Sequence, residues 1–93
     1  TALCTPTRAC LLTGRNAHRV GAGTIAEWAR DQPGYRGVIS GDVPTLPGML
    51  RGAGYATVAV GKWHLAPVAA ANASGPFEHW PTGRGFDKWY GFH

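Results

Sequence analysis

A cysteine and an arginine near the start of the chain place a reactive sulfur close to a permanent positive charge. They are Cys4 and Arg8, in the run Cys-Thr-Pro-Thr-Arg. This run has the features of a helix start, because Thr5 can serve as the N-cap and Pro6 can occupy the first helical position. Cys4 would then lie just before a helix over 5–13, beside free N–H groups at the positive end of the dipole, which stabilise anions. The pattern predicts an anion site that contains a sulfur nucleophile.

A lysine and a histidine two residues apart form a second candidate group, Lys62 and His64. They follow the apolar, β-branched run 55–60, which predicts a strand buried on both faces. Residues i and i+2 of an extended chain point to the same side, so both can address one site while Trp63 packs inward. Open α/β sheets bind ligands beyond the carboxyl ends of their strands. We therefore expect Lys62 as a cation and His64 as a proton-transfer group to share a site with Cys4.

A second helix is expected immediately before that strand. Thr45 can cap it, Pro47 falls in its first turn, apolar residues recur at helical spacing, and Gly54 ends it. Helix, glycine turn and buried strand form an α/β unit. The fold class predicted from this unit is α/β, with a mainly parallel sheet that helices flank.

Three other stretches have less regular patterns. A short helix is expected over 24–30, with Thr24 as the N-cap and Glu27 completing a capping box. The alanine-rich run 67–76 predicts a surface loop. The aromatic-dense run 84–92 is expected to pack on the core.

Composition narrows the classes of partner. The chain has 93 residues and a formal net charge of +4. A basic balance favours anionic partners, but the arginines are scattered and no run of basic residues occurs, so we expect no nucleic-acid binding. No apolar run approaches the ~18–20 residues that a membrane-spanning helix requires, so we expect no membrane insertion.

Two cysteines, Cys4 and Cys10, are present. Their spacing is not that of a zinc site, and on one helix they would face different directions, which argues against a disulfide between them. Cys10 is expected to be a small buried hydrophobic residue.

The motif around Cys4 and Arg8 resembles the signature of the type I sulfatases, C-x-P-S/T-R-x-x-L-x-T-G-R. The resemblance extends along the chain, and its order and spacing are similar to bacterial arylsulfatases. The stretches that carry it are Cys4-Thr5-Pro6-Thr7-Arg8, Leu12-Thr13-Gly14-Arg15, Gly23-Thr24-Ile25-Ala26-Glu27, Thr45-Leu46-Pro47, Ala53-Gly54-Tyr55, Gly61-Lys62-Trp63-His64-Leu65 and Gly85-Phe86-Asp87.

This resemblance implies a specific chemistry. An activating formylglycine-generating enzyme would recognise the stretch from Cys4 to Arg8 and oxidise Cys4 to formylglycine, an aldehyde. A Ca²⁺ ion would take the modified Cys4 as one ligand. Arg8 would hold the formylglycine, Lys62 would bridge it to the substrate sulfate, and His64 would transfer a proton or donate a hydrogen bond. The substrate would be a small-molecule sulfate ester.

The resemblance also implies a larger setting for the chain. Residues 1–93 would be part of a single sulfatase catalytic domain with an alkaline-phosphatase-like fold. An acidic metal-binding stretch would precede them, and the remainder of the domain would follow. A bacterial cytoplasm or periplasm would suit such a protein better than a membrane.

Two other functions are compatible with the same residues. A phosphonate or phosphate monoester hydrolase could use the same aldehyde, because both kinds of anion are tetrahedral. Alternatively, Cys4 could stay a thiol in a non-catalytic module whose helix N-terminus binds an anion.

Overall fold

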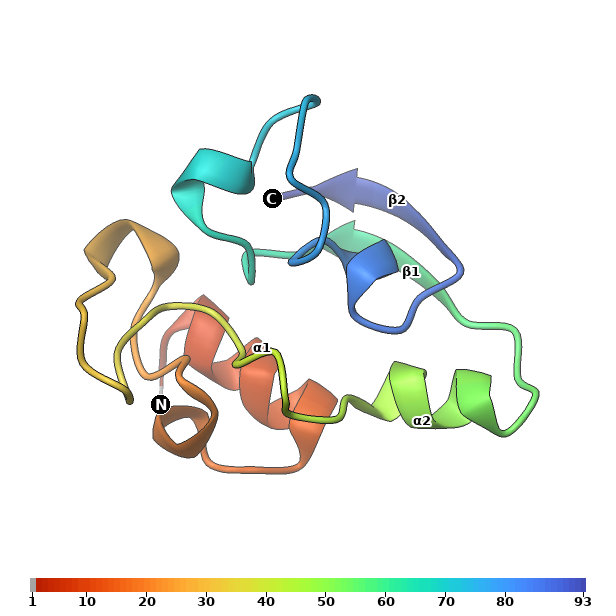
Figure 1. Cartoon of the computed structure of the whole chain (residues 1–93), viewed down its shortest axis with the longest axis horizontal. Helices are drawn as coiled ribbons and strands as arrows, with labels where there is room; N and C mark the ends of the chain where they lie inside the picture. The colour runs from red at the N-terminus through yellow and green to blue at the C-terminus, as the bar shows by residue number, and fades with distance from the viewer. Residues whose placement is uncertain (1) are drawn as a thin grey trace.

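The computed structural model describes residues 2–93, in which two helices lie on one side of two parallel strands (Figure 1). The remaining elements are short 3-10 turns. In chain order the elements are α1 (Cys4–Thr13), η1 (Ala17–Val20), η2 (Ala26–Trp28), α2 (Leu46–Gly52), β1 (Val58–Lys62), η3 (Val68–Ala70), η4 (Pro81–Gly83) and β2 (Lys88–Phe92).

The two strands pair in parallel, with Val58 opposite Lys88 and Lys62 opposite Phe92. A parallel pair needs a long connection, and residues 63–87 supply it. Thr57 fixes the start of both strands, because its buried hydroxyl donates to the carbonyl of Gly85 at 2.7 Å. The α/β character and the parallel pairing expected from the sequence are confirmed within residues 2–93.

The strand itself differs from its prediction in position and burial. It was expected over 55–60 and is found at Val58–Lys62. Burial on both faces is wrong for this chain, since the Val60 side chain is 79% exposed and Val58 is also exposed. The reason is that β1 has a single strand neighbour within residues 2–93, and no described element covers these valines.

Helix α1 begins one residue earlier than expected. Cys4 is its first residue, and the N-cap is Leu3, which makes no side-chain cap. The predicted cap by Thr5 is therefore wrong, because the Thr5 hydroxyl donates to the carbonyl of His64 instead. The helix ends as predicted, at a left-handed Gly14 whose N–H bonds to the carbonyl of Cys10.

Helix α2 begins as predicted, with the Thr45 hydroxyl accepting the N–H of Gly48 at 3.2 Å. The expected helix over 24–30 is reduced to the single turn η2, whose N-cap is Ile25 without a side-chain bond. The capping box of Thr24 is therefore wrong. The loop expected over 67–76 contains the turn η3.

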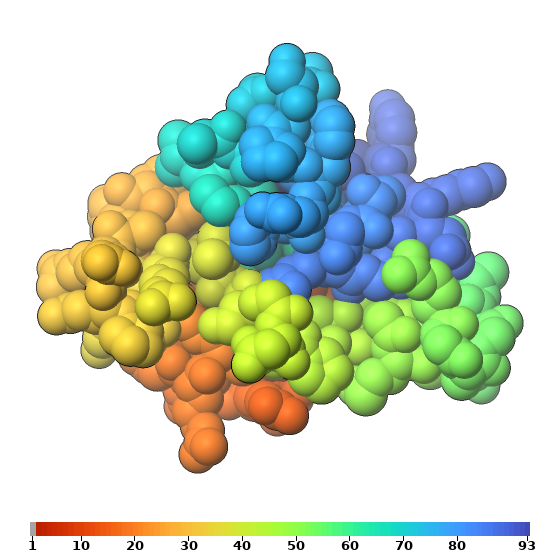
Figure 2. Space-filling model, viewed as in Figure 1, coloured from red at the N-terminus to blue at the C-terminus, as the bar shows by residue number. Residues whose placement is uncertain are grey.

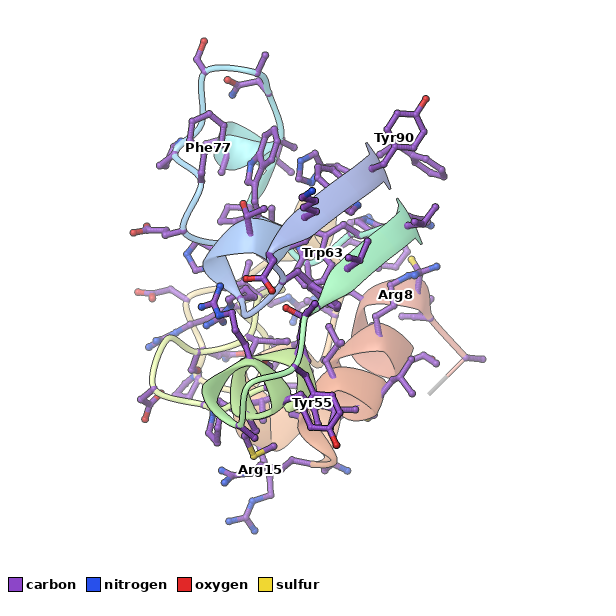
Figure 3. All side chains as sticks on the ribbon, turned by 90° about the vertical axis from the view of Figure 1, so that its right-hand side faces the viewer. Arg8, Arg15, Tyr55, Trp63, Phe77 and Tyr90 are labelled. Carbon is purple, nitrogen blue, oxygen red and sulfur yellow. The ribbon has the colours of Figure 1, made fainter. Side chains whose placement is uncertain are left out.

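A small core lies between α1, the loops after it and the segment that follows β1. Its fully or largely buried members are Ala9, Val20, Ala22, Ile39, Trp63, Leu65 and Ala66. Phe86 and Trp89 pack against this core, as expected, whereas Tyr90 projects from β2 into solvent (Figure 3). Cys10 is exposed, which corrects its predicted burial, and both cysteines are free thiols.

None of the helices described for residues 2–93 has the length and apolar character needed to cross a membrane.

Candidate active site

Cys4 and His64 are in direct contact. The Sγ atom of Cys4 lies 2.8 Å from Nδ1 of His64. The neighbouring Thr5 donates its hydroxyl to the His64 carbonyl at 2.6 Å, so the first turn of α1 contacts both the ring and the backbone of this residue. Cys4 is half-buried, and its sulfur is therefore positioned without being sealed in the core.

His64 reaches this position by a turn of the backbone and not by strand alternation. The N–H of Trp63 still bonds to the carbonyl of Phe92 at 2.8 Å, beyond the last residue of β1. His64 then adopts a left-handed conformation with φ of 54°, which is uncommon for a residue other than glycine. The expected proximity to Cys4 is present, but the i, i+2 argument for it was incorrect. Trp63 is buried, as predicted.

Glu27 completes the arrangement on the other side of the imidazole. Its carboxylate oxygens lie 2.9 and 3.0 Å from Nε2 of His64. The hydrogen bond with His64 is the main cause that lowers the pKa of Glu27 below its usual value. An ionised carboxylate only accepts hydrogen bonds, so Nε2 carries a proton, and in the neutral ring Nδ1 then presents its lone pair to Cys4.

Sequence reasoning missed Glu27 as a site residue. It assigned the side chain to a local capping box, which the structure lacks. The available signal was the position of Glu27 within one of the stretches that carry the family resemblance. Its partner is remote in the chain, so no local rule would identify the contact.

Arg8 joins α1 to the end of β1. Its guanidinium donates to the carbonyl of Lys62 at 2.8 Å, and Figure 3 shows it between the helix and the strand. Its buried Nε atom has no hydrogen-bond partner among residues 2–93. Arg8 therefore brings a positive charge to the same end of the sheet as Cys4, with donor capacity unused.

Lys62 lies at this end too, but it lines a different hollow from Cys4. The hollow beside Cys4 is about 340 Å³ and is lined by Leu3, Thr7 and Arg8 among others. Lys62 lines a second hollow of about 300 Å³, and Arg8 borders both. The positive charge of Lys62 also contributes to the lowered pKa of Glu27. The four predicted residues thus gather at one end of the sheet, without a single cavity common to all of them.

Among residues 2–93 no group of three or more histidine, cysteine, aspartate or glutamate side chains is arranged to bind a metal ion. Position 4 is the ligand that the sequence resemblance implies.

Comparisons with known proteins agree with the sequence motifs. A family model described as Sulfatase matches residues 1–93. The chain is 42% identical to N-acetylgalactosamine-6-sulfatase of Sus scrofa, covering 96% of the chain and 16% of that protein. It is 37% identical to steryl-sulfatase of Homo sapiens, covering 96% of the chain and 15% of that protein. An uncharacterized sulfatase of Schizosaccharomyces pombe is 38% identical, and the match covers 91% of the chain and 15% of that protein.

The fold is similar to a solved structure. The crystal structure of Ps i-CgsB superposes with a TM-score of 0.72 at 32% identity, covering 97% of this chain and 17% of that one. The same protein solved in complex with k-i-k-neocarrahexaose gives a TM-score of 0.71. The chain thus spans about one sixth of the length of these relatives.

Proposed function

Because the chain belongs to the sulfatase family, we propose that the protein containing it hydrolyses sulfate esters through a formylglycine formed from Cys4. The observation that carries the proposal is the 2.8 Å contact between Cys4 Sγ and His64 Nδ1, within the family signature. Residues 1–93 would form part of a single catalytic domain of alkaline-phosphatase-like fold, with a mainly parallel sheet flanked by helices. A formylglycine-generating enzyme would be the partner that acts on Cys4–Arg8.

The hydrated aldehyde would supply two hydroxyls on one carbon. One would attack sulfur and displace the alcohol of the ester, and deprotonation of the other would break the C–O bond to the sulfate, which releases sulfate and restores the aldehyde. A thiolate at Cys4 would lack this release step. Oxygen at the position of Sγ would lie within hydrogen-bond distance of His64, which supports this modification. Nδ1 would accept the proton of a hydroxyl at position 4, and Glu27 would keep the ring in the required tautomer.

Two cations of this chain would act on the sulfate. A sulfate ester is an anion, so its charge must be neutralised before a nucleophile approaches. Arg8 has an unpaired Nε among the described residues, and Lys62 has no hydrogen bond from its ammonium group there, so both have donors to offer. Arg8 would orient the formylglycine, and Lys62 would bridge it to the sulfate.

Ca²⁺ is the metal that the resemblance implies. It prefers oxygen ligands, which suits a hydrated aldehyde at position 4 better than a thiolate. Position 4 would be one ligand, and the other side chains of residues 2–93 do not fit a complete Ca²⁺ site. We therefore assign no catalytic step to the metal.

The substrate would be a small-molecule sulfate ester. The named relatives differ in the alcohol that they release, since one is an N-acetylgalactosamine-6-sulfatase and another a steryl-sulfatase. The arylsulfatase-like pattern of motifs makes 4-nitrophenyl sulfate the first substrate to assay.

The experiment is peptide mass spectrometry across Thr1–Arg15, combined with kinetics, on the natural protein produced together with a formylglycine-generating enzyme. We expect an aldehyde at position 4, turnover of 4-nitrophenyl sulfate, and no turnover by the Cys4→Ala variant with its circular dichroism unchanged. An unmodified thiol in an inactive protein would favour an anion-binding module. Faster turnover of a matched phosphonate monoester would instead identify a phosphonate hydrolase.

A further inference from the structure

We propose that a hollow beside η2 binds a sugar ring carrying an anionic group, next to the ring that bears the scissile sulfate. The hollow has a volume of about 300 Å³ and is lined by Gly23, Thr24, Trp28, Arg30 and Tyr35. This volume is at the lower end of the range for small-ligand sites and suits a single ring. The inference rests on the proposed function for its account of the neighbouring ring.

The hollow has two exposed aromatic walls. The Trp28 side chain is 63% exposed and Tyr35 is 41% exposed. The Tyr35 ring is steadied by His18, which packs edge-on with centroids 5.2 Å apart. The negative face of an aromatic ring attracts the C–H groups on the flat face of a sugar, and stacking removes apolar area of both from water. Two such rings in one hollow favour a flat ligand.

The loop that forms these walls is braced by backbone hydrogen bonds. Ala22 and Tyr35 form an antiparallel bridge, and the N–H of Gly23 bonds to the carbonyl of Gly34 at 2.9 Å. Arg30 donates its N–H to the carbonyl of Tyr35 at 2.8 Å. A Cβ at Gly23 would meet the Gly34 carbonyl at 2.5 Å, so glycine permits this close approach. The backbone around the hollow is therefore held in place without a ligand, which lowers the entropic cost of binding.

Arg30 gives the hollow its charge preference. Its guanidinium has no ion pair or hydrogen bond within residues 2–93. Asp31 follows it in the chain but does not line the hollow. A free guanidinium at the rim matches a planar pair of oxygens, which a uronate carboxylate or a second sulfate provides.

The hollow lies close to the proposed reaction centre. Trp28 directly follows Glu27, so their Cα atoms are about 3.8 Å apart. Glu27 bonds to His64, and these two residues line another hollow of about 210 Å³. The turn η2 thus contributes to both hollows, and Figure 2 shows this part of the chain at the surface at one end of the molecule.

The test measures ligand binding by calorimetry to the natural protein in its Cys4→Ala form, so that no ligand is consumed. The probes are a uronate-containing disaccharide 6-sulfate, its uronate methyl ester, and a disulfated galactose disaccharide. We expect Arg30→Ala to weaken binding of both doubly anionic sugars about tenfold and that of the methyl ester less than about twofold. Trp28→Ala should weaken binding of all three sugars. Arg30→Lys should weaken binding of the doubly anionic sugars by less than Arg30→Ala does.

Arg19→Ala is the matched control, because it removes an equal charge from an exposed residue outside the hollow. It should leave all three affinities unchanged. Failure of all three sugars to bind, or affinities of the Trp28 and Arg30 variants equal to those of the parent Cys4→Ala protein, would overturn the inference whatever the enzyme's activity. If the sugars bind as expected and the formylglycine-bearing protein hydrolyses no sulfate ester, the sugar site stands and the proposed function fails.

Discussion

Cys4 Sγ and His64 Nδ1 lie 2.8 Å apart although sixty residues separate them in the sequence. Two further bonds join the same segments, from Thr5 to the His64 carbonyl and from Arg8 to the Lys62 carbonyl. The first turns of α1 are therefore attached to the end of β1 by residues of the family signature. The contacts that fix the position of α1 on the sheet also fix the geometry of the candidate site.

Replacing Glu27 with glutamine should lower kcat while leaving the fold intact. The amide can still accept a hydrogen bond from Nε2, but it has no negative charge to stabilise a protonated imidazole. We expect a fall in kcat of roughly tenfold. Glu78→Gln is the control, because Glu78 is exposed and lies 3.8 Å from His79, away from the site. Equal kcat values for the two variants would show that Glu27 has no part in positioning His64.

His64→Asn and His64→Ala should separate the chemistry of this residue from its backbone conformation. Both variants lack the imidazole, so we expect each to lose about 100-fold or more in kcat. His64 has φ of 54°, a region that asparagine tolerates and alanine does not. Urea denaturation should therefore show the alanine variant to be less stable than the asparagine variant by about 1 kcal/mol. Equal stabilities would mean that the backbone relaxes at this turn.

Local sequence rules predicted the elements whose causes are local. The Gly14 end of α1 and the Thr45 cap of α2 depend on residues within one turn, and both were predicted correctly. The role of Thr5 could not be predicted this way, because the hydroxyl that could cap its own helix is used by the distant carbonyl of His64. Glu27 was misassigned for the same reason.

Burial was the other property that sequence patterns misjudged. An apolar, β-branched strand is typical of a sheet covered on both faces, yet Val60 is exposed because no described element lies over it. Cys10 was expected inside on the grounds of residue type alone, and it lies on the outer face of α1. Residue type indicates a preference for burial, whereas the packing of other elements decides it.

Thr57→Val should destabilise the pairing of β1 and β2. The buried hydroxyl of Thr57 donates to the Gly85 carbonyl at 2.7 Å and accepts the N–H of Asp87 at 3.0 Å. Valine has the same shape but leaves the Gly85 carbonyl without its donor, at a cost of about 1–3 kcal/mol, whereas the N–H of Asp87 keeps its bond to the backbone carbonyl of residue 57 at 2.7 Å. Urea denaturation of the natural protein would measure the loss. Thr82→Val, at an exposed position, should change the stability little, and an equal effect of both substitutions would contradict this role.

His79 should make the protein less stable as the pH falls. Burial is the main cause that lowers its pKa below the ordinary 6.5, and the positive charge of Arg84 adds to the effect. The unfolded chain therefore binds a proton at a higher pH than the native state does. The resulting loss in the free energy of unfolding is absent well above pH 6.5. It grows as the pH drops from there toward the lowered pKa of His79 in the native state.

Urea denaturation between about pH 8 and pH 5 would test this direction of the pH dependence of stability, with His79→Asn compared to the wild type. The asparagine variant has no proton to bind, so its free energy of unfolding should fall less steeply over this range. Some slope should remain, because burial also lowers the pKa of His93. His18→Asn removes an exposed imidazole and serves as the control. A slope that stays at the wild-type value in the His79 variant would show that this imidazole is protonated equally easily in the native and unfolded states.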